Sequence, residues 1–235
     1  MSDRWGIDAV ILAGGLGKRL RGIVDDRPKP MATIRDRPFL DILIDDLTRQ
    51  GLRRLILCVG HHGDQIVTHL RSRSDAEFVF SEESIPLGTG GAIRHAAHLV
   101  HSDPFLALNG DALCRVDYER FIAFHRERNS TASIVVAAAR GRSDGGTVEL
   151  ADDARIVRFC EKASGVNTAS TYINAGVYLL RRDLPTLWRQ SDPFSLEHDI
   201  FPELVSRKNC YGFVVDEEVV DIGTPERYVE AQSKL

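Results

Sequence analysis

Residues 9–110 alternate between short apolar runs and segments in which apolar positions recur at helical spacing. In the segment that follows Pro38, Phe39, Leu43 and Leu47 share one face and Asp41 and Asp45 lie opposite, which predicts an amphipathic helix. Short apolar runs bounded by glycine and polar residues predict buried strands. These runs are 9–12, 54–59, 77–80 and 105–108, and a further short helix is predicted at 64–70. Strands that alternate with helices at this spacing are typical of an α/β fold with a parallel sheet.

The pattern changes near Arg140, where consecutive short strands replace the alternation. A helix capped by Asp117 and a strand at 131–139 precede this change. The elements predicted after it are a hairpin of 148–150 and 156–159, strands at 172–180, 210–215 and 219–222, and helices at 184–188 and 196–205. Thr224 and Pro225 have the residue types preferred at a helix N-cap and first helical position. We predict one domain, 1–235, with two parts, 1–139 and 140–235.

The first apolar run leads into a glycine-rich segment that is rich in cations. Gly14, Gly15 and Gly17 would let backbone N–H groups approach phosphate oxygens, and Lys18 and Arg19 would add positive charge. The segment lacks the Walker pattern, and a leucine stands where the dinucleotide fingerprint needs its third glycine. We therefore predict a phosphate cradle of another kind; the alternative is an ordinary tight turn with solvated basic residues.

Lys29 lies between Pro28 and Pro30. Each proline fixes its own φ and favours extended geometry in the residue before it. We expect the lysine on a stiff, extended backbone that positions its charge. The alternative is a rigid turn with an exposed lysine.

A second glycine-rich segment, 86–91, follows the strand at 77–80 and precedes a helix predicted at 92–99. Asp111 follows the strand at 105–108 through Asn109 and Gly110. Loops at the carboxyl ends of neighbouring strands line the ligand crevice of an open α/β sheet. A carboxylate there suits Mg²⁺, which takes one or two carboxylates together with phosphate oxygens. The alternatives are a helix entry with extra glycines and a simple turn.

Composition narrows the classes of function. The apolar fraction of 43% is enough for a core, and the net charge of −4 disfavours a nucleic-acid-binding surface. The four cysteines contain no C-x-x-C pair, so we expect reduced thiols and neither a disulfide frame nor a zinc site. The start resembles no signal peptide, and no apolar run is long enough for a membrane span. We expect a cytoplasmic protein with no membrane partner.

Seven motifs, taken in order, resemble those of the sugar-1-phosphate nucleotidyltransferases. They are residues 12–20, 28–31, 86–92, 109–111, 161–162, 174–178 and 221–225, and they span nearly the whole chain. Within that family the chain is most similar to the D-glycero-α-D-manno-heptose 1-phosphate guanylyltransferases. The resemblance implies a Rossmann-like three-layer αβα mixed sheet with a small sugar-binding lobe. It also implies that 1–139 is mainly the nucleotide-binding part and 140–235 mainly the sugar-binding part with the C-terminal helix. The chain ends shortly after the last motif, so we expect it to lack the C-terminal domain of longer members.

The resemblance implies that a sugar 1-phosphate oxygen attacks the α-phosphorus of a nucleoside triphosphate in line and that pyrophosphate leaves. Arg19 and Lys29 are the implied catalytic residues, and Asp111 and Asp221 would hold Mg²⁺. The implied nucleotide-binding residues are Leu12, Ala13, Gly14, Gly15, Gly17, Glu82, Glu83, Pro86, Gly88, Thr89 and Asp111. The implied sugar-phosphate-binding residues are Asn109, Gly110, Glu161, Lys162 and Asn174. Lys18 stands where the family more often has a small residue or threonine, so it receives no role.

The choice of base depends on two glutamates. Guanine presents adjacent N1–H and N2–H₂ donors, and a carboxylate of Glu82 or Glu83 could accept both. This favours GTP, with the backbone of 88–91 completing the base and ribose contacts; the alternative is that both glutamates face solvent. Other sugars remain open, namely mannose 1-phosphate with GTP, and glucose or N-acetylmuramate 1-phosphate with UTP. A homodimer also remains open.

A different class of function is a non-catalytic module that senses nucleotides. Such a module would be expected to lose part of the charged set, yet Arg19, Lys29, Asp111, Lys162 and Asp221 are all present. We therefore favour the enzyme.

Overall fold

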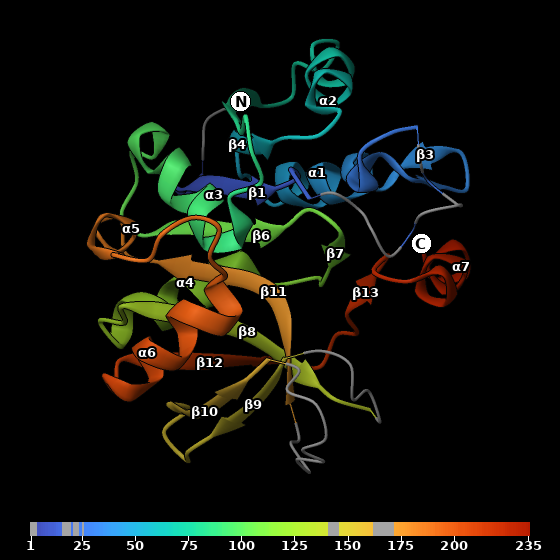
Figure 1. Cartoon of the computed structure of the whole chain (residues 1–235). Helices are drawn as coiled ribbons and strands as arrows, with labels where there is room; N and C mark the ends of the chain where they lie inside the picture. The colour runs from blue at the N-terminus through green and yellow to red at the C-terminus, as the bar shows by residue number, and fades with distance from the viewer. Residues whose placement is uncertain (1–3, 16–19, 21–23, 25, 141–145, 162–171) are drawn as a thin grey trace.

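The computed structural model describes residues 4–15, 20, 24, 26–140, 146–161 and 172–235. Within these residues nine strands form one mixed sheet. They are β1 (Asp8–Leu12), β4 (Arg54–Val59), β5 (Glu77–Glu82), β6 (Phe105–Asn109), β8 (Ala132–Ala138), β9 (Thr147–Leu150), β10 (Ile156–Cys160), β11 (Tyr172–Leu180) and β12 (Cys210–Val215). The main order is β10-β9-β11-β6-β1-β4-β5, and β8 joins β11 to β12. Figure 1 shows the sheet crossing the molecule from β4 to the β9–β10 hairpin.

Helices cover both faces of this sheet. They are α1 (Phe39–Arg49), α2 (Gly63–Leu70), α3 (Gly88–Ala96), α4 (Tyr118–Glu127), α5 (Leu184–Leu187), α6 (Phe201–Ser206) and α7 (Pro225–Lys234). Short helical turns lie at η2 (Lys29–Met31), η3 (Ala97–Leu99) and η4 (Leu196–Ile200). Two small ribbons complete the described structure, β2 (Thr33–Ile34) with β3 (Arg37–Pro38), and β7 (Ala112–Leu113) with β13 (Val220–Asp221).

The alternation of side chains along the central strands separates two cores. In β1, Ala9 and Ile11 pack with residues of α1, α2 and α4, whereas Val10 packs with residues of α3, α5 and α6. Strand β4 divides its side chains in the same way, since Leu55 and Leu57 belong to the first core and Ile56 to the second. Successive side chains of a strand point to opposite faces, so a strand that is apolar throughout is buried on both sides. This confirms the predicted αβα layers.

Among the described strands, the parallel pairs join β1, β4, β5 and β6, and one further parallel pair joins β8 and β12. Strand β1 pairs in parallel with β4 and with β6, and β4 pairs in parallel with β5. Strand β11 then enters antiparallel beside β6, and β9 and β10 form an antiparallel hairpin. The expected change near Arg140 therefore corresponds to the change from parallel crossovers to antiparallel neighbours.

Three local expectations are corrected. Lys29 lies on the helical turn η2 and not on an extended segment, because Met31 N–H donates to Pro28 O and Ala32 N–H donates to Lys29 O. The helix expected from residue 92 already begins at Gly88 and passes into η3 after Ala96. The strand expected at 77–80 continues to Glu82, because its ladder with β4 runs that far.

The predicted helix starts at Asp117 and Thr224 are confirmed. The side chain of Asp117 accepts a hydrogen bond from Arg120 N–H, and that of Thr224 accepts one from Arg227 N–H. Among the described residues all four cysteines are free, as expected, and no helix is long and apolar enough to cross a bilayer.

The buried His125 of α4 makes folding sensitive to pH. It is 4% exposed, its Nδ1 lies 2.9 Å from Ser133 Oγ, and burial lowers its pKa from 6.5 to about 4. The unfolded chain therefore binds a proton below pH 6.5 that the folded chain resists until about pH 4. The stability contributed by the neutral ring is present above pH 6.5 and is lost as the pH falls toward 4.

We predict that His125→Gln, which cannot charge in this range, flattens the pH dependence of folding. The free energy of unfolding of the wild type should fall by roughly 1–3 kcal/mol more than that of the variant between pH 7 and pH 4.5. Urea unfolding of both proteins at the two pH values measures this. Equal losses in the two proteins would contradict it.

Candidate functional site

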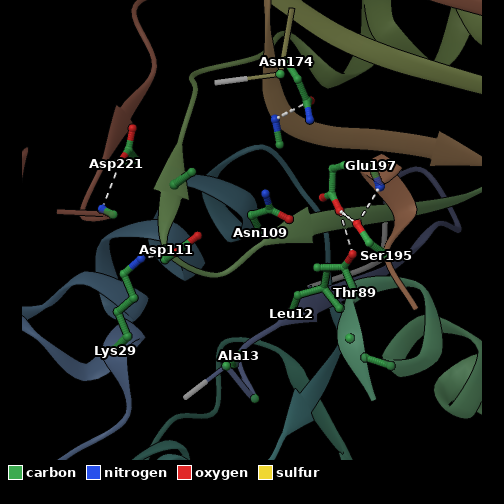
Figure 2. Close-up of a pocket in the computed structure, with 18 of the residues that line it drawn as sticks. Leu12, Ala13, Lys29, Thr89, Asn109, Asp111, Asn174, Ser195, Glu197 and Asp221 are labelled. Carbon is green, nitrogen blue, oxygen red and sulfur yellow. Dashed lines mark hydrogen bonds and ion pairs between the residues drawn. The ribbon is translucent and has the colours of Figure 1, made fainter. Parts of the chain in front are cut away.

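A cavity of about 610 Å³ opens where β1 and β6 end. Its lining includes predicted site residues from both parts of the chain, namely Leu12, Ala13, Gly14, Gly15, Lys29, Glu83, Pro86, Gly88, Thr89, Asn109, Asp111, Glu161, Asn174 and Asp221. Figure 2 shows Lys29, Asp111 and Asp221 on one side of this cavity and Thr89, Ser195 and Glu197 on the other. Residues so far apart in sequence meet because the parallel strands end at one edge of the sheet.

The described part of the first glycine segment is held closely against neighbouring strands. Ala13 N–H donates to Cys58 O at 2.9 Å, and Gly110 N–H donates to Leu12 O at 2.9 Å. A Cβ on Gly14 would lie 2.9 Å from Glu83 Oε1 and 3.2 Å from Gly60 N, so a side chain there would displace the Glu83 carboxylate and press on the backbone of Gly60. Gly14 therefore lets Glu83 and the backbone of Gly60 pack closely beside the cavity.

The prediction for the rest of this segment is not tested. Gly17, Lys18 and Arg19 lie outside the described residues, as does Lys162.

Lys29 and Asp111 form an ion pair at the cavity wall. The lysine side chain is 10% exposed and the carboxylate 34% exposed. Turn η2 supplies the lysine and the segment between β6 and β7 supplies the aspartate. The two charged groups predicted from separate motifs are thus in direct contact.

Asp221 lies on the strand next to Asp111. In the β7–β13 ribbon Asp221 pairs with Ala112, and Ile222 N–H donates to Asp111 O at 3.0 Å. Both carboxylates line the cavity. Asp221 also accepts hydrogen bonds from Gly223 N–H at 2.9 Å and from Arg227 Nη1 at 2.8 and 3.0 Å.

This pair of carboxylates suits a hard divalent cation that shares its shell with a substrate. Carboxylate oxygens are the protein ligands that such a cation prefers, and one or two of them are typical where phosphates complete the shell. The described residues contain no group of three or more His, Cys, Asp or Glu placed to hold a metal by themselves. The residues therefore fit a cation that arrives with a phosphorylated ligand.

The structure distinguishes the two candidate glutamates. Glu83 lines the cavity, is partly buried beside Gly14, and accepts a hydrogen bond from Leu87 N–H at 3.2 Å. Burial raises the pKa of its carboxyl. Glu82 is exposed at the end of β5 and lines a separate hollow beside α2. The geometry therefore favours Glu83 over Glu82 as a ligand of the main cavity.

The second glycine segment packs against another part of the chain more than it faces the cavity. The N–H groups of Gly90 and Gly91 donate to Phe194 O at 3.1 and 3.4 Å. A Cβ on Gly90 would lie 2.4 Å from the Phe194 ring, and one on Gly88 would lie 2.3 Å from Phe194 O. The N–H groups of Gly90 and Gly91 are thus engaged within the protein, and the expectation that the backbone of 88–91 contacts the base and ribose stays a prediction for Gly88 and Thr89. The cavity is lined here by Gly88 and Thr89.

Sequence reasoning missed a polar cluster that joins the two parts of the chain. Glu197 Oε2 accepts hydrogen bonds from the hydroxyls of Thr89 and Ser195, both at 2.7 Å, and Tyr178 OH lies 3.4 Å from Oε1. Thr89 Oγ1 also accepts from Leu196 N–H at 2.9 Å. Ser195 caps η4 and could have been found as an N-cap, but no local signal pairs Glu197 with a residue of α3.

Two further predicted residues, Asn109 and Asn174, lie at a bulge in β11. The pairing of β11 with β8 shifts between Asn174 and Tyr178, where Gly176 has φ +73° and donates to Asn174 Oδ1 at 2.9 Å. A Cβ on Gly176 would lie 2.9 Å from Asn109 Nδ2, so the bulge lets Asn109 approach. Asn109 Oδ1 is buried and finds no hydrogen-bond partner among the described residues. Such an oxygen is a candidate for a ligand contact.

The comparisons with known proteins agree with this geometry. A model of the nucleotidyl transferase family matches residues 8–235. The chain is 35% identical over 230 residues to D-glycero-α-D-manno-heptose 1-phosphate guanylyltransferase of Aneurinibacillus thermoaerophilus, covering 97% of this chain and 98% of the relative. It is 31% identical to the catalytic subunit beta of mannose-1-phosphate guanylyltransferase of Drosophila pseudoobscura pseudoobscura, of which it spans 61%.

Two solved structures resemble the chain, one in sequence and fold and the other in fold alone. HddC from Yersinia pseudotuberculosis, complexed with GMP-PN, is 33% identical, has a TM-score of 0.85, and is matched over 97% of this chain and 99% of its own. UDP-glucose pyrophosphorylase from Acinetobacter baumannii is 21% identical with a TM-score of 0.82, covering 96% of this chain and 92% of its own, and bears on the fold alone. The chain, with its cavity at the ends of β1 and β6, is therefore a member of the nucleotidyl transferase family.

Proposed function

We propose that this enzyme condenses GTP with a sugar 1-phosphate, foremost D-glycero-α-D-manno-heptose 1-phosphate, and releases pyrophosphate. The observation that supports this most is one cavity lined by Gly14 and Gly15 of the first glycine segment and by Lys29, Glu83, Asp111, Asn174 and Asp221. A nucleotide and a sugar phosphate must meet for direct transfer, and a single cavity of this size permits it. The reaction belongs in the cytoplasm, where nucleoside triphosphates are made.

Glu83 is the residue we assign to the base. A carboxylate accepts two hydrogen bonds, which matches the adjacent N1–H and N2–H₂ donors of guanine. Its position against Gly14 brings it beside the segment proposed to cradle the phosphates. Pro86, Gly88 and Thr89 continue the same wall.

Charge neutralisation is the main chemical task of the phosphate side. Lys29, with Arg19 from the same part of the chain, would stabilise negative charge on the α-phosphate and on the leaving pyrophosphate. Asp111 and Asp221 would hold Mg²⁺, which supplies further positive charge to the triphosphate when bound. The backbone N–H groups of Gly14, Gly15 and Gly17 would orient the phosphates.

The sugar side would bring the second substrate into line. Glu161 and Asn174 would contact sugar hydroxyls, and Lys162 would bind the sugar phosphate. Asn109 lines the cavity with a buried Oδ1 that has no hydrogen-bond partner among the described residues, and we assign it, with Gly110, to the sugar phosphate. An oxygen of the sugar phosphate forms a bond to the α-phosphorus while the bond from that phosphorus to the β-bridging oxygen breaks. No enzyme side chain is needed as a nucleophile.

The two parts of the chain bind different substrates in this proposal, but they are not independent of each other. We assign residues 1–139 mainly to the nucleotide and 140–235 mainly to the sugar. The Glu197 cluster nevertheless links the second part to α3 of the first.

Mannose 1-phosphate is the second candidate substrate, supported by the 31% identity to the mannose-1-phosphate enzyme.

We predict that pyrophosphate release in a matrix of nucleoside triphosphates and sugar 1-phosphates is fastest with GTP and the heptose. The carboxylate of Glu83 favours guanine over uracil or thymine, which present acceptors that it cannot satisfy. A preference for UTP or dTTP would contradict the assignment of the base. If no pair of substrates releases pyrophosphate while GTP still binds, the result would favour a nucleotide-sensing module.

We predict that Glu83→Gln raises the KM for GTP about ten- to a hundredfold, because one charge-assisted hydrogen bond to guanine is lost. Glu82→Gln is the matched control and should leave KM unchanged, since Glu82 is exposed outside the main cavity. Steady-state kinetics of the two variants measures the difference. An equal effect in both variants would remove the distinction between them.

We predict that Lys29→Ala lowers kcat by about a hundredfold or more, since it removes charge stabilisation of the transition state. Its ion pair with Asp111 sits at the cavity wall, so the fold should survive. Circular dichroism and thermal melting check the fold, and pyrophosphate release checks turnover. A folded variant with wild-type turnover would exclude the proposed role.

A further inference from the structure

Each carboxylate proposed to hold the metal already faces a cation of the chain. Lys29 pairs with Asp111, and Arg227 pairs with Asp221. A single nitrogen of Arg227, Nη1, lies 2.8 and 3.0 Å from the two carboxylate oxygens. The side chains of Asp221 and Arg227 are only 11% and 18% exposed. The second pair is therefore close and largely shielded from water.

The position of Arg227 in its helix is unfavourable without this partner. It lies in the first turn of α7, where its N–H donates to the N-cap Thr224. That end of a helix carries partial positive charge, which favours acidic residues and opposes a cation. The arginine thus weakens the helix start, and the carboxylate of Asp221 offsets this cost.

Docking of α7 does not depend on this ion pair. Tyr228 OH and Gln232 Nε2 both donate to Thr33 O, at 2.7 and 2.8 Å, and Ala231 is fully buried in the core. These contacts fix the helix against β2 from its other positions. Arg227 faces the main cavity and the smaller cavity beside α7.

We propose that Arg227 is an exchangeable counter-ion of Asp221. It neutralises Asp221 while no metal is bound, and it moves to phosphate oxygens of the ligand when a divalent cation takes the carboxylate. This rests on the proposed function insofar as Asp221 is a metal ligand. The exchange avoids both a bare buried carboxylate and an arginine held against a divalent cation.

If Arg227 only orients Asp221, its removal should change the metal affinity in the opposite direction. Removal of an orienting partner weakens metal binding. Removal of a competing charge strengthens it, because a cation beside the carboxylate repels the incoming metal. The sign of the change in metal affinity therefore distinguishes the two roles.

The test uses the full chain as wild type, Arg227→Met, Asp221→Asn and Lys234→Met. Lys234 is a matched control, because it lies on the same helix and pairs with Glu218 and Glu230 outside the main cavity. Mn²⁺ binding without nucleotide is followed by electron paramagnetic resonance. Arg227→Met should bind Mn²⁺ about tenfold more tightly than the wild type, and Lys234→Met should match the wild type. Should Arg227→Met fail to fold, Arg227→Gln, also uncharged, should show the same direction.

Pyrophosphate at saturating Mn²⁺ tests the second half of the exchange by calorimetry. Arg227→Met should bind it about tenfold more weakly, because a charge-assisted contact to phosphate is lost. Unchanged or weaker Mn²⁺ binding, or unchanged pyrophosphate binding, would overturn the proposal.

Asp221→Asn separates this inference from the proposed function. Asp221→Asn should lose Mn²⁺ affinity if Asp221 is a ligand, and an unchanged affinity would instead contradict the proposed metal site and with it the exchange. Neither Mn²⁺ nor pyrophosphate reports on base or sugar, so a wrong assignment of GTP or heptose leaves this test intact.

Discussion

The parallel pairing of β1 between β4 and β6 is the constraint on which the site depends. It brings Leu12 and Asn109 opposite one another, and Cys58 O accepts from Ala13 N–H just beyond the strand. A side chain on Gly14 would then press against Glu83 and Gly60. Gly14 of the proposed phosphate cradle, the proposed base ligand Glu83 and the Asp111 turn are therefore placed by one set of backbone hydrogen bonds.

The second part of the chain completes the cavity by packing onto this edge. Phe194 O accepts from two N–H groups at the start of α3, and the Glu197 carboxylate accepts from Thr89 in the same turn. Glycines at this helix start pack closely against Phe194, whereas Gly14 packs closely against Glu83 and Gly60. The proposed sugar side is thus fixed to the proposed nucleotide side through α3. A substitution in one part should therefore affect the other part.

Much of this architecture follows from local sequence. The apolar runs at β1, β4 and β6 predict strands buried on both faces, and Asp117 and Thr224 mark helix starts that the structure confirms. The family motifs assign Lys29 and Asp111 to one site, but their ion pair is found only in the structure. What local reasoning could not supply are contacts between distant segments. Glu197 meets Thr89 across 108 positions, and nothing near either residue indicates it. The extended backbone expected at Lys29 failed because hydrogen bonds within 28–32 close a helical turn that two prolines tolerate.

In the proposed reaction, the cavity at the ends of β1 and β6 holds both substrates at once, and the nucleotidyl group passes directly from one to the other. A GTP analogue that carries sulfur and a defined configuration at the α-phosphorus tests this, with the heptose 1-phosphate as acceptor. A single in-line displacement inverts the configuration at phosphorus, and we predict inversion in the GDP-sugar product. Retention of configuration would require two displacements through a covalent enzyme intermediate, and it would contradict direct transfer.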